Sequence, residues 1–158
     1  MALSNTAGEA TLYIPLQGHG LVETSSSLDA DFKEHHSSQV TVQTSTLDVV
    51  LKDAEDVVLI KIDVEGHERQ AFEGGEGVVR RNRPYVAIEL LDRGDFGYFN
   101  DFVNRSDYLS YRLRAHEAIQ ADEMRFDAAA WNHVLVPKEK NAEFLALLAG
   151  LQIPVTRE

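Results

Sequence analysis

Apolar and polar residues alternate in the first third of the chain, and this alternation predicts short strands. Residues 9–15 alternate between the two kinds of side chain, which is typical of a half-buried strand. Residues 40–42 repeat the pattern over a shorter stretch. Residues 46–52 (TLDVVLK) follow, and they predict a short helix that is capped by Ser45 or Thr46. Residues 17–38 are polar and rich in serine, histidine and glycine, and they predict a long loop.

The middle of the chain has a different pattern, a nearly continuous apolar run at residues 57–62 (VVLIKI). Such a run predicts a strand that is buried on both faces of a parallel sheet. Residues 85–91 (YVAIELL) predict a second buried strand, and the residues between the two strands predict a helix that is interrupted at Gly74 and Gly75. Strand, helix and strand at this spacing form a βαβ unit with parallel strands.

The last third predicts four further elements. Residues 96–105 favour a helix, residues 109–113 and 131–136 favour strands, and residues 142–148 favour a helix that ends before Gly150. We expect the two late strands to pair antiparallel at one edge of the sheet. The sequence thus predicts an α/β fold, with a parallel βαβ core and an antiparallel C-terminal edge.

Composition narrows the class of protein. A length of 158 residues with 44% apolar residues suits one globular domain, which we expect to span residues 1–158. The net charge of −11 argues against a nucleic-acid partner, and the absence of cysteine excludes disulfides and thiolate chemistry. There is neither an apolar run of roughly 20 residues nor a signal-peptide pattern. We therefore expect a cytoplasmic protein without a membrane partner.

Candidate functional residues follow the two buried strands. In open α/β sheets, ligands bind at the carboxyl ends of the strands. Seven residues with suitable chemistry lie at those positions: Asp63, Glu65, Gly66, His67, Glu68, Glu89 and Asp92. The sequence therefore predicts an acidic rim at this edge of the sheet.

Each of these residues also has a structural interpretation. Asp63 or Glu65 could cap the following helix through its N-terminal amides. Glu68 is expected to be solvated. His67 has the proton affinity of a proton acceptor near neutral pH, but a surface histidine without a role fits its position equally well. Glu89 lies within an apolar strand, so it is either a site residue or a member of a core ion pair.

A metal-dependent site is a weaker alternative. Clusters of carboxylate oxygens suit Mg²⁺ or Mn²⁺, and the four acidic residues Asp63, Glu65, Glu68 and Glu89 would form such a cluster. Glu65 and Glu68 are three positions apart and could share a helix face.

The stretch Leu59 to Glu68 (LIKIDVEGHE) is similar to the signature of FkbM-type methyltransferases. Other parts of the chain resemble the family in the expected order. They are residues 2–13, Thr46-Leu47-Asp48, Arg83-Pro84 with Glu89-Leu90, and residues 132–137.

The resemblance implies a Rossmann-like methyltransferase fold and methyl transfer from S-adenosylmethionine to a hydroxyl oxygen of a small-molecule acceptor. It implies that Asp63 and Glu65 lie near the cofactor's methyl group or the acceptor, and that a carboxylate or His67 accepts the hydroxyl proton. Ligands in such sheets bind at the carboxyl ends of the strands, and we call this the strand-end rule. The resemblance and the strand-end rule together give Asp63, Glu65, His67 and Glu89 as candidate catalytic residues. Asp63 and Gly66 are the candidate cofactor contacts, and no metal ligand is implied.

The sequence also departs from the family pattern, because the family's glycine-rich turn and acidic ribose ligand are not found in it. We therefore expect the chain to correspond to the C-terminal half of the family's domain, without its N-terminal cofactor-binding strands, and to be inactive by itself. The strand at residues 57–62 would then be an exposed edge. We expect it to pair with a second copy of the chain or with a separate N-terminal half. A non-catalytic subunit is the alternative function, and residues 17–38 and 92–104 are the expected substrate-facing segments.

Overall fold

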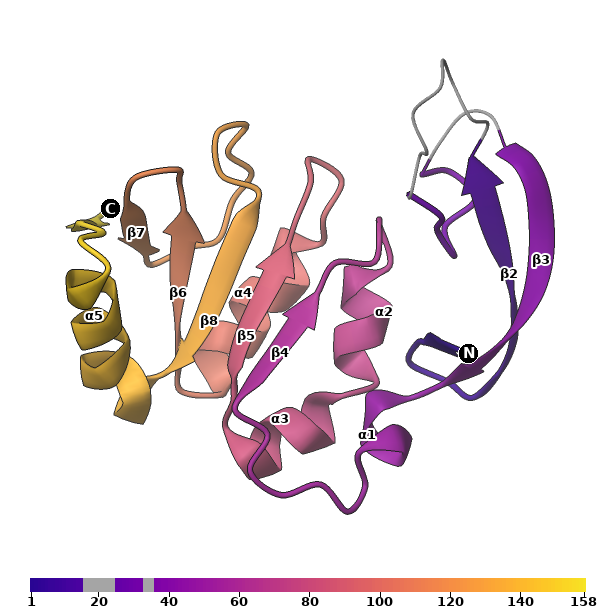
Figure 1. The fold of residues 1–158 in the computed structure, drawn as a ribbon, viewed down its shortest axis with the longest axis horizontal. Coiled ribbons are helices and arrows are strands. Elements are labelled where there is room, and N and C mark those ends of the chain that lie inside the picture. Colours follow the sequence, from indigo (N-terminus) through magenta and orange to yellow (C-terminus); the bar gives the residue numbers. More distant parts are fainter. Residues whose placement is uncertain (16–24, 33–35) are drawn as a thin grey trace. The chain divides into compact units, whose positions relative to one another are not determined.

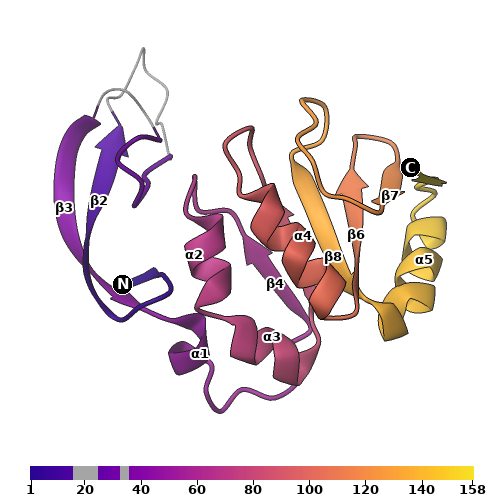
Figure 2. The same cartoon turned by 180° about the vertical axis from the view of Figure 1, so that it is seen from behind.

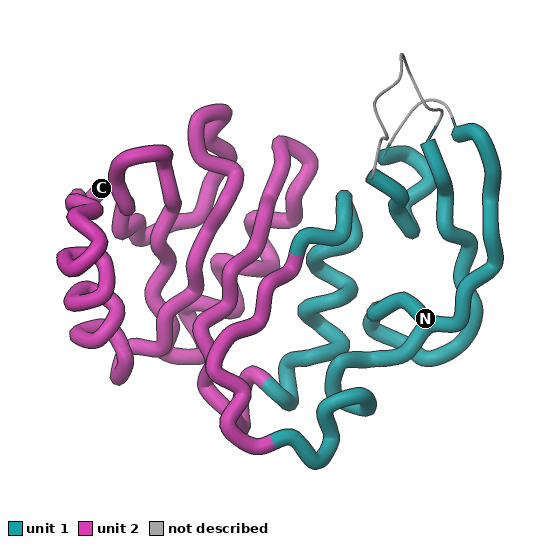
Figure 3. Tube along the Cα trace, viewed as in Figure 1, with its two compact units in different colours: residues 1–54, 63–78 teal, residues 55–62, 79–158 magenta. Residues whose placement is uncertain are grey.

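The computed structural model describes residues 1–15, 25–32 and 36–158. The chain forms two compact units, which are described one at a time and coloured separately in Figure 3. Unit 1 comprises residues 1–54 and 63–78, and unit 2 comprises residues 55–62 and 79–158.

Unit 1 contains a three-stranded sheet with the strand order β1-β3-β2 (Figure 1). Its strands are β1 (Ala2–Leu3), β2 (Gly8–Pro15) and β3 (His36–Ser45). The central strand β3 pairs antiparallel with β2 and parallel with β1. The alternating strands are confirmed, although β3 begins at His36, inside the segment expected to be a loop. Part of that segment, at residues 17–24 and 33–35, lies outside the described residues.

Three short helices follow the sheet along the chain. They are α1 (Leu47–Val50), α2 (Glu68–Glu73) and α3 (Glu76–Asn82), whose last residues belong to unit 2. Thr46 is the N-cap of α1, as predicted, because its side-chain oxygen accepts a hydrogen bond from the Val49 amide at 3.2 Å. The two-glycine interruption separates α2 from α3, which confirms the expected bend.

Unit 2 contains a six-stranded sheet with the order β4-β5-β8-β6-β7-β9. Its strands are β4 (Leu59–Ile62), β5 (Tyr85–Glu89), β6 (Tyr108–Leu113), β7 (Ala118–Ala121), β8 (Asn132–Pro137) and β9 (Val155–Arg157). The predicted parallel pairing is confirmed, with β4 in register against β5 from Leu59–Tyr85 to Ile62–Ile88.

The C-terminal part of this sheet differs from the prediction in one respect. β6 and β8 pair antiparallel as expected, but β8 lies inside the sheet, because it also pairs antiparallel with β5. The edge is instead formed by β7 and β9, which pair in parallel with each other. The mixed α/β class is thus confirmed, while the Rossmann-like assignment stays a prediction.

Helices cover both faces of the sheet in unit 2. The helix α4 (Phe96–Arg105) lies over one face, as Figure 2 shows, and its Phe96 ring contacts His133 edge-on at a centroid distance of 6.0 Å. The helix α5 (Asn141–Gly150) follows a short 3-10 helix, Lys138–Lys140, and buries Phe144 against Tyr111 and Val134. Since His133 and Val134 are neighbours in one strand, the two helices cover opposite faces.

β4 is the outer strand of this sheet, with β5 as its neighbour. Val58 and Leu59 are 63% and 59% exposed. The expectation that the run at residues 57–62 is buried on both faces of the sheet is therefore wrong, because β4 has only one neighbouring strand among the described residues of unit 2. Its pairing with another chain stays a prediction. None of the described helices has the length and apolar character needed to cross a bilayer.

Candidate functional site

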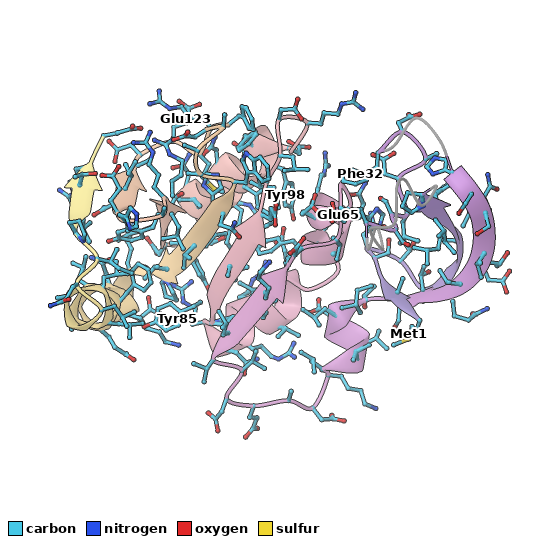
Figure 4. All side chains as sticks on the ribbon, turned by 45° about the horizontal axis from the view of Figure 1, so that its top comes forward. Met1, Phe32, Glu65, Tyr85, Tyr98 and Glu123 are labelled. Carbon is cyan, nitrogen blue, oxygen red and sulfur yellow. The ribbon has the colours of Figure 1, made fainter. Side chains whose placement is uncertain are left out.

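The loop that follows β4 has an unusual backbone conformation. Glu65 has a φ of 55° and Gly66 a φ of 93°, so two consecutive residues lie in the left-handed region. A side chain at Gly66 would also clash, because a Cβ there would be 2.9 Å from Cδ2 of Phe32. Figure 4 labels Glu65 and Phe32 in this part of unit 1. Left-handed backbone at a non-glycine residue costs about 1–3 kcal/mol and is often found where a site requires a fixed geometry.

The buried carboxylate of Glu68 stabilises this conformation. Its Oε1 accepts hydrogen bonds from the amides of Gly66, at 2.9 Å, and Val64, at 3.3 Å. The expectation that Glu68 is solvated is therefore wrong. The left-handed turn leaves two amides without partners in a helix or strand, and the carboxylate at the start of α2 is their acceptor. The N-cap residue of α2 is His67, whose side chain makes no capping bond.

A second segment of unit 1 holds the same loop from the other side. The Ser27 hydroxyl donates a hydrogen bond of 2.5 Å to the Glu65 carbonyl. The amide of Asp29 in turn donates to the Ser27 oxygen at 2.9 Å. Neither residue is predicted as a site residue by the sequence pattern. Their Ser-x-Asp spacing is typical of a local side-chain turn, but nothing in it points to a partner 38 residues away.

The loop lines a pocket of about 430 Å³ that lies within unit 1. Three of the predicted site residues contribute to it, Asp63, Glu65 and His67. The remaining walls come from the loop, the first two strands and the segment before Asp29, and they are Ala2, Leu3, Leu12, Ser26, Leu28 and Val64. The pocket thus combines two carboxylates and an imidazole with mainly apolar walls, which is the usual make-up of a small-molecule site.

His67 is the pocket's titratable base. It is half-buried, and its Nε2 lies 3.0 Å from the Ser4 hydroxyl oxygen. Burial lowers the pKa of the His67 imidazole below its ordinary value, and the Asp29 carboxylate opposes that effect. The ring is therefore neutral near pH 7 and can accept a proton.

The other predicted site residues lie elsewhere. Gly66 and Glu68 shape the loop, as described above. Glu89 ends β5 and Asp92 follows in an exposed turn, and both belong to unit 2. Within the described ranges, no three His, Cys, Asp or Glu side chains form a group that could hold a metal ion, so the metal-site alternative gains no support.

A cationic group suits this pocket better than an anionic one. The acidic residues Asp63 and Glu65 are among the residues that line it, and no lysine or arginine is among the described residues that form it. The apolar walls suit methylene groups or a ring. These residues therefore fit the sulfonium end of S-adenosylmethionine, whereas the sequence has no glycine-rich turn between a strand and a helix to hold a nucleotide end.

Comparison with known proteins gives one match. The model of a family described as the methyltransferase FkbM domain matches residues 1–123. The matched range includes the signature at residues 59–68 and every residue that lines the pocket. No curated protein and no solved structure matches the chain.

Proposed function

The chain belongs to the methyltransferase FkbM domain family, and we propose that its pocket serves the transfer of a methyl group from S-adenosylmethionine to a hydroxyl oxygen of a small molecule, a reaction that we expect to need a further cofactor-binding half. The observation that supports this proposal is the pocket of unit 1, where three residues of the family signature meet. Asp63 and Glu65 supply negative charge that can attract a cationic reactant, and His67 supplies a proton acceptor.

The two carboxylates would favour a cationic reactant. S-adenosylmethionine supplies a methyl group on a positively charged sulfur, which becomes a neutral thioether when the methyl group leaves. Asp63 and Glu65 would hold this end of the cofactor by charge attraction, which is strongest where apolar walls exclude water. Candidate walls for that purpose are Leu3, Leu12 and Val64.

His67 would act on the acceptor. The acceptor hydroxyl loses its proton as its oxygen bonds to the methyl carbon, and the neutral imidazole takes that proton. This proton transfer supplies only part of the acceleration. Much of the rate would come from holding the methyl group and the acceptor oxygen in line. Glu89 in unit 2 remains a candidate catalytic residue, and Gly66 remains a candidate cofactor contact.

Saturation-transfer NMR with millimolar S-adenosylmethionine tests the proposal. We expect weak binding that is seen by NMR but too weak for calorimetry at micromolar protein, because the sequence has no glycine-rich nucleotide turn. The double variant Asp63→Asn/Glu65→Gln should lose most of the transferred signal. Asp53→Asn is the matched control, since Asp53 is exposed elsewhere in unit 1. No signal with the unchanged protein, or equal signals from both variants, would contradict the proposal.

A non-catalytic role in assembly is the second candidate, and the exposed edge of unit 2 favours it. An apolar strand at the edge of a sheet offers backbone hydrogen bonds and side-chain contacts to another strand. The occupant we propose is β4 of a second copy, which would make a continuous sheet from two molecules. Light scattering should then report a dimer, and Leu59→Lys should convert it to a monomer. If the unchanged protein is a monomer, the assembly role is contradicted. If it also binds S-adenosylmethionine, the methyltransferase proposal stands as the single candidate.

A further inference from the structure

The backbone of Ser4 is fixed by two neighbours within unit 1. Its amide donates a hydrogen bond of 2.9 Å to the Ser45 carbonyl, which continues the pairing between β1 and β3. Its carbonyl lies against Gly74, so closely that a Cβ at position 74 would be 2.1 Å from the carbonyl oxygen. Ser4 is buried, with 8% of its surface exposed. The hydroxyl group is thus held in one place relative to α2, which ends just before Gly74.

Four side chains form a line of three hydrogen bonds along α2. The Asn5 side-chain nitrogen lies 2.9 Å from Oε2 of Glu73. The Ser4 hydroxyl oxygen lies 3.4 Å from Oδ1 of Asn5 and 3.0 Å from Nε2 of His67. The line therefore runs from a carboxylate at one end of α2 to the imidazole at the other.

The carboxylate sets the direction of every bond in this line. A carboxylate only accepts, so Asn5 must direct its NH₂ group to Glu73 and its carbonyl oxygen to Ser4. The single hydroxyl proton of Ser4 is then donated to Asn5. The Ser4 oxygen can then only accept a hydrogen bond from His67, so Nε2 of His67 must carry the hydrogen.

We propose that Ser4, oriented by Asn5, is a positioning residue that holds His67 in its Nε2–H tautomer and leaves Nδ1 as the atom that accepts the proton. This inference rests on the proposed function, in which His67 is the base. A neutral histidine has two tautomers, and only the nitrogen without hydrogen is a base. Fixing the tautomer therefore fixes which ring nitrogen carries the lone pair that accepts the proton.

The charges around the ring are compatible with this role. The carboxylate of Asp29, from residues 25–32, favours the protonated imidazole, while burial favours the neutral one. Asp63 and Glu65 line the same pocket. The nearby carboxylate of Glu68 is directed to the loop amides. Ser4 itself can remain an acceptor after His67 is protonated, since Nε2 keeps its hydrogen in both forms.

Nitrogen-15 NMR of labelled histidine tests the proposal on the full chain. In the unchanged protein, above the pKa of His67, we expect one dominant tautomer with hydrogen on Nε2. Ser4→Ala removes the acceptor and should give a mixture of both tautomers, whereas Ser4→Thr keeps the hydroxyl and should restore the single form. Asn5→Ala frees the Ser4 proton to be donated to Nε2, and should shift the population to the Nδ1–H tautomer.

The outcomes separate this inference from the proposed function. The tautomer is measured without cofactor or acceptor, so a chain that fails to bind S-adenosylmethionine can still show the expected spectra. A dominant Nδ1–H form in the unchanged protein would overturn the inference, as would spectra that neither Ser4→Ala nor Asn5→Ala changes. If Ser4→Ala fails to fold, the opposite effects expected of Ser4→Thr and Asn5→Ala still decide the question.

Discussion

The two units of the chain bury different kinds of residues. Unit 2 encloses an apolar core on both faces of its sheet, with residues such as Ile88, Phe99 and Leu135 at 0% exposure. Among its described residues, unit 1 buries only three of the apolar core residues, Ala71, Phe72 and Val78. Its buried polar residues outnumber them, and they are Ser4, Ser27, Thr44, Ser45 and Glu68. Apolar burial is non-directional, whereas a hydrogen bond fixes both a distance and an angle. The unit that carries the pocket is thus the one whose geometry depends on individual polar partners.

Unit 2 also buries three polar side chains, which are Ser110, Arg112 and His133. Arg112 and His133 face each other across β6 and β8 and are 2% and 1% exposed. Arg112 forms ion pairs with Asp127, at 3.3 Å, and Glu158, at 2.7 Å. Neither ring nitrogen of His133 has a hydrogen-bond partner among the described residues. The core of unit 2 therefore contains a histidine whose burial is favourable only while its ring is neutral.

The largest expected effect tests the core of unit 2. Phe99→Ala should lower the free energy of unfolding by about 3–5 kcal/mol, because it leaves a cavity under α4. Urea denaturation measures the loss, and hydrogen exchange locates it. Exchange should rise in β5, β6 and β8, while the loop amides of unit 1 keep their protection. Leu147→Ala on the exposed side of α5 is the control, and equal loss of protection in both units would break the comparison.

The next effect is a pH dependence from His133. Burial, and then the charge of Arg112, lowers the pKa of His133 to about 4, against 6.5 for an exposed histidine. Below pH 6.5 the unfolded chain takes up a proton that the folded chain does not, so stability falls as the pH drops towards 4. The fall amounts to about 3 kcal/mol, and no change is expected from this group above pH 7.

Denaturation curves between pH 4 and 7.5 measure this dependence. His133→Leu has a similar volume and no titratable group, so it should flatten most of the slope and raise stability at pH 5. A smaller slope remains from His67, whose pKa is also lowered by burial. An unchanged slope in His133→Leu would show that the acid sensitivity does not come from the core of unit 2.

A smaller effect is expected from the hydrogen bonds of unit 1. Glu68→Ala removes the acceptor of two loop amides and should cost about 1–3 kcal/mol. Amide exchange at Val64 and Gly66 should rise, while the core of unit 2 is unaffected. Glu68→Gln keeps an acceptor oxygen and should retain much of the protection. If both variants behave alike, the carboxylate is not what holds the loop.

The smallest effect concerns the cap of α1. Thr46→Ala should cost about 1 kcal/mol, because the Val49 amide loses its acceptor, and Thr46→Ser should restore most of it. Thermal denaturation measures the difference. A cost as large as that of Phe99→Ala would mean that a single polar partner in unit 1 outweighs an apolar core residue in unit 2.

Much of the fold could be predicted from the sequence, because the apolar pattern locates the strands, although it overstated the burial of residues 57–62. The runs at residues 57–62 and 85–91 gave β4 and β5 in the correct parallel arrangement. β7 and β9 could not be found this way. β7 is a four-residue strand with two alanines, and β9 is exposed at all three of its residues. Such strands are defined by the neighbours they pair with.

The candidate site, like the fold, was only partly predictable from the sequence. The strand-end rule located Asp63, Glu65 and His67, which line one pocket in unit 1. It could not find Ser4 or Ser27, because each acts through one hydrogen bond to a residue far along the chain. Glu68 was misjudged for a related reason, since its partners are backbone amides that only the left-handed turn exposes.

The left-handed turn has a consequence for how a descendant of this chain would evolve. Gly66 and Glu68 are required for the shape of the loop whether or not any methyl group is transferred. A lineage that lost catalysis would still be selected to keep both residues as long as it had to fold. In a related sequence, the glycine and the glutamate two positions after it therefore report only that the loop has survived, and not that methyl transfer has.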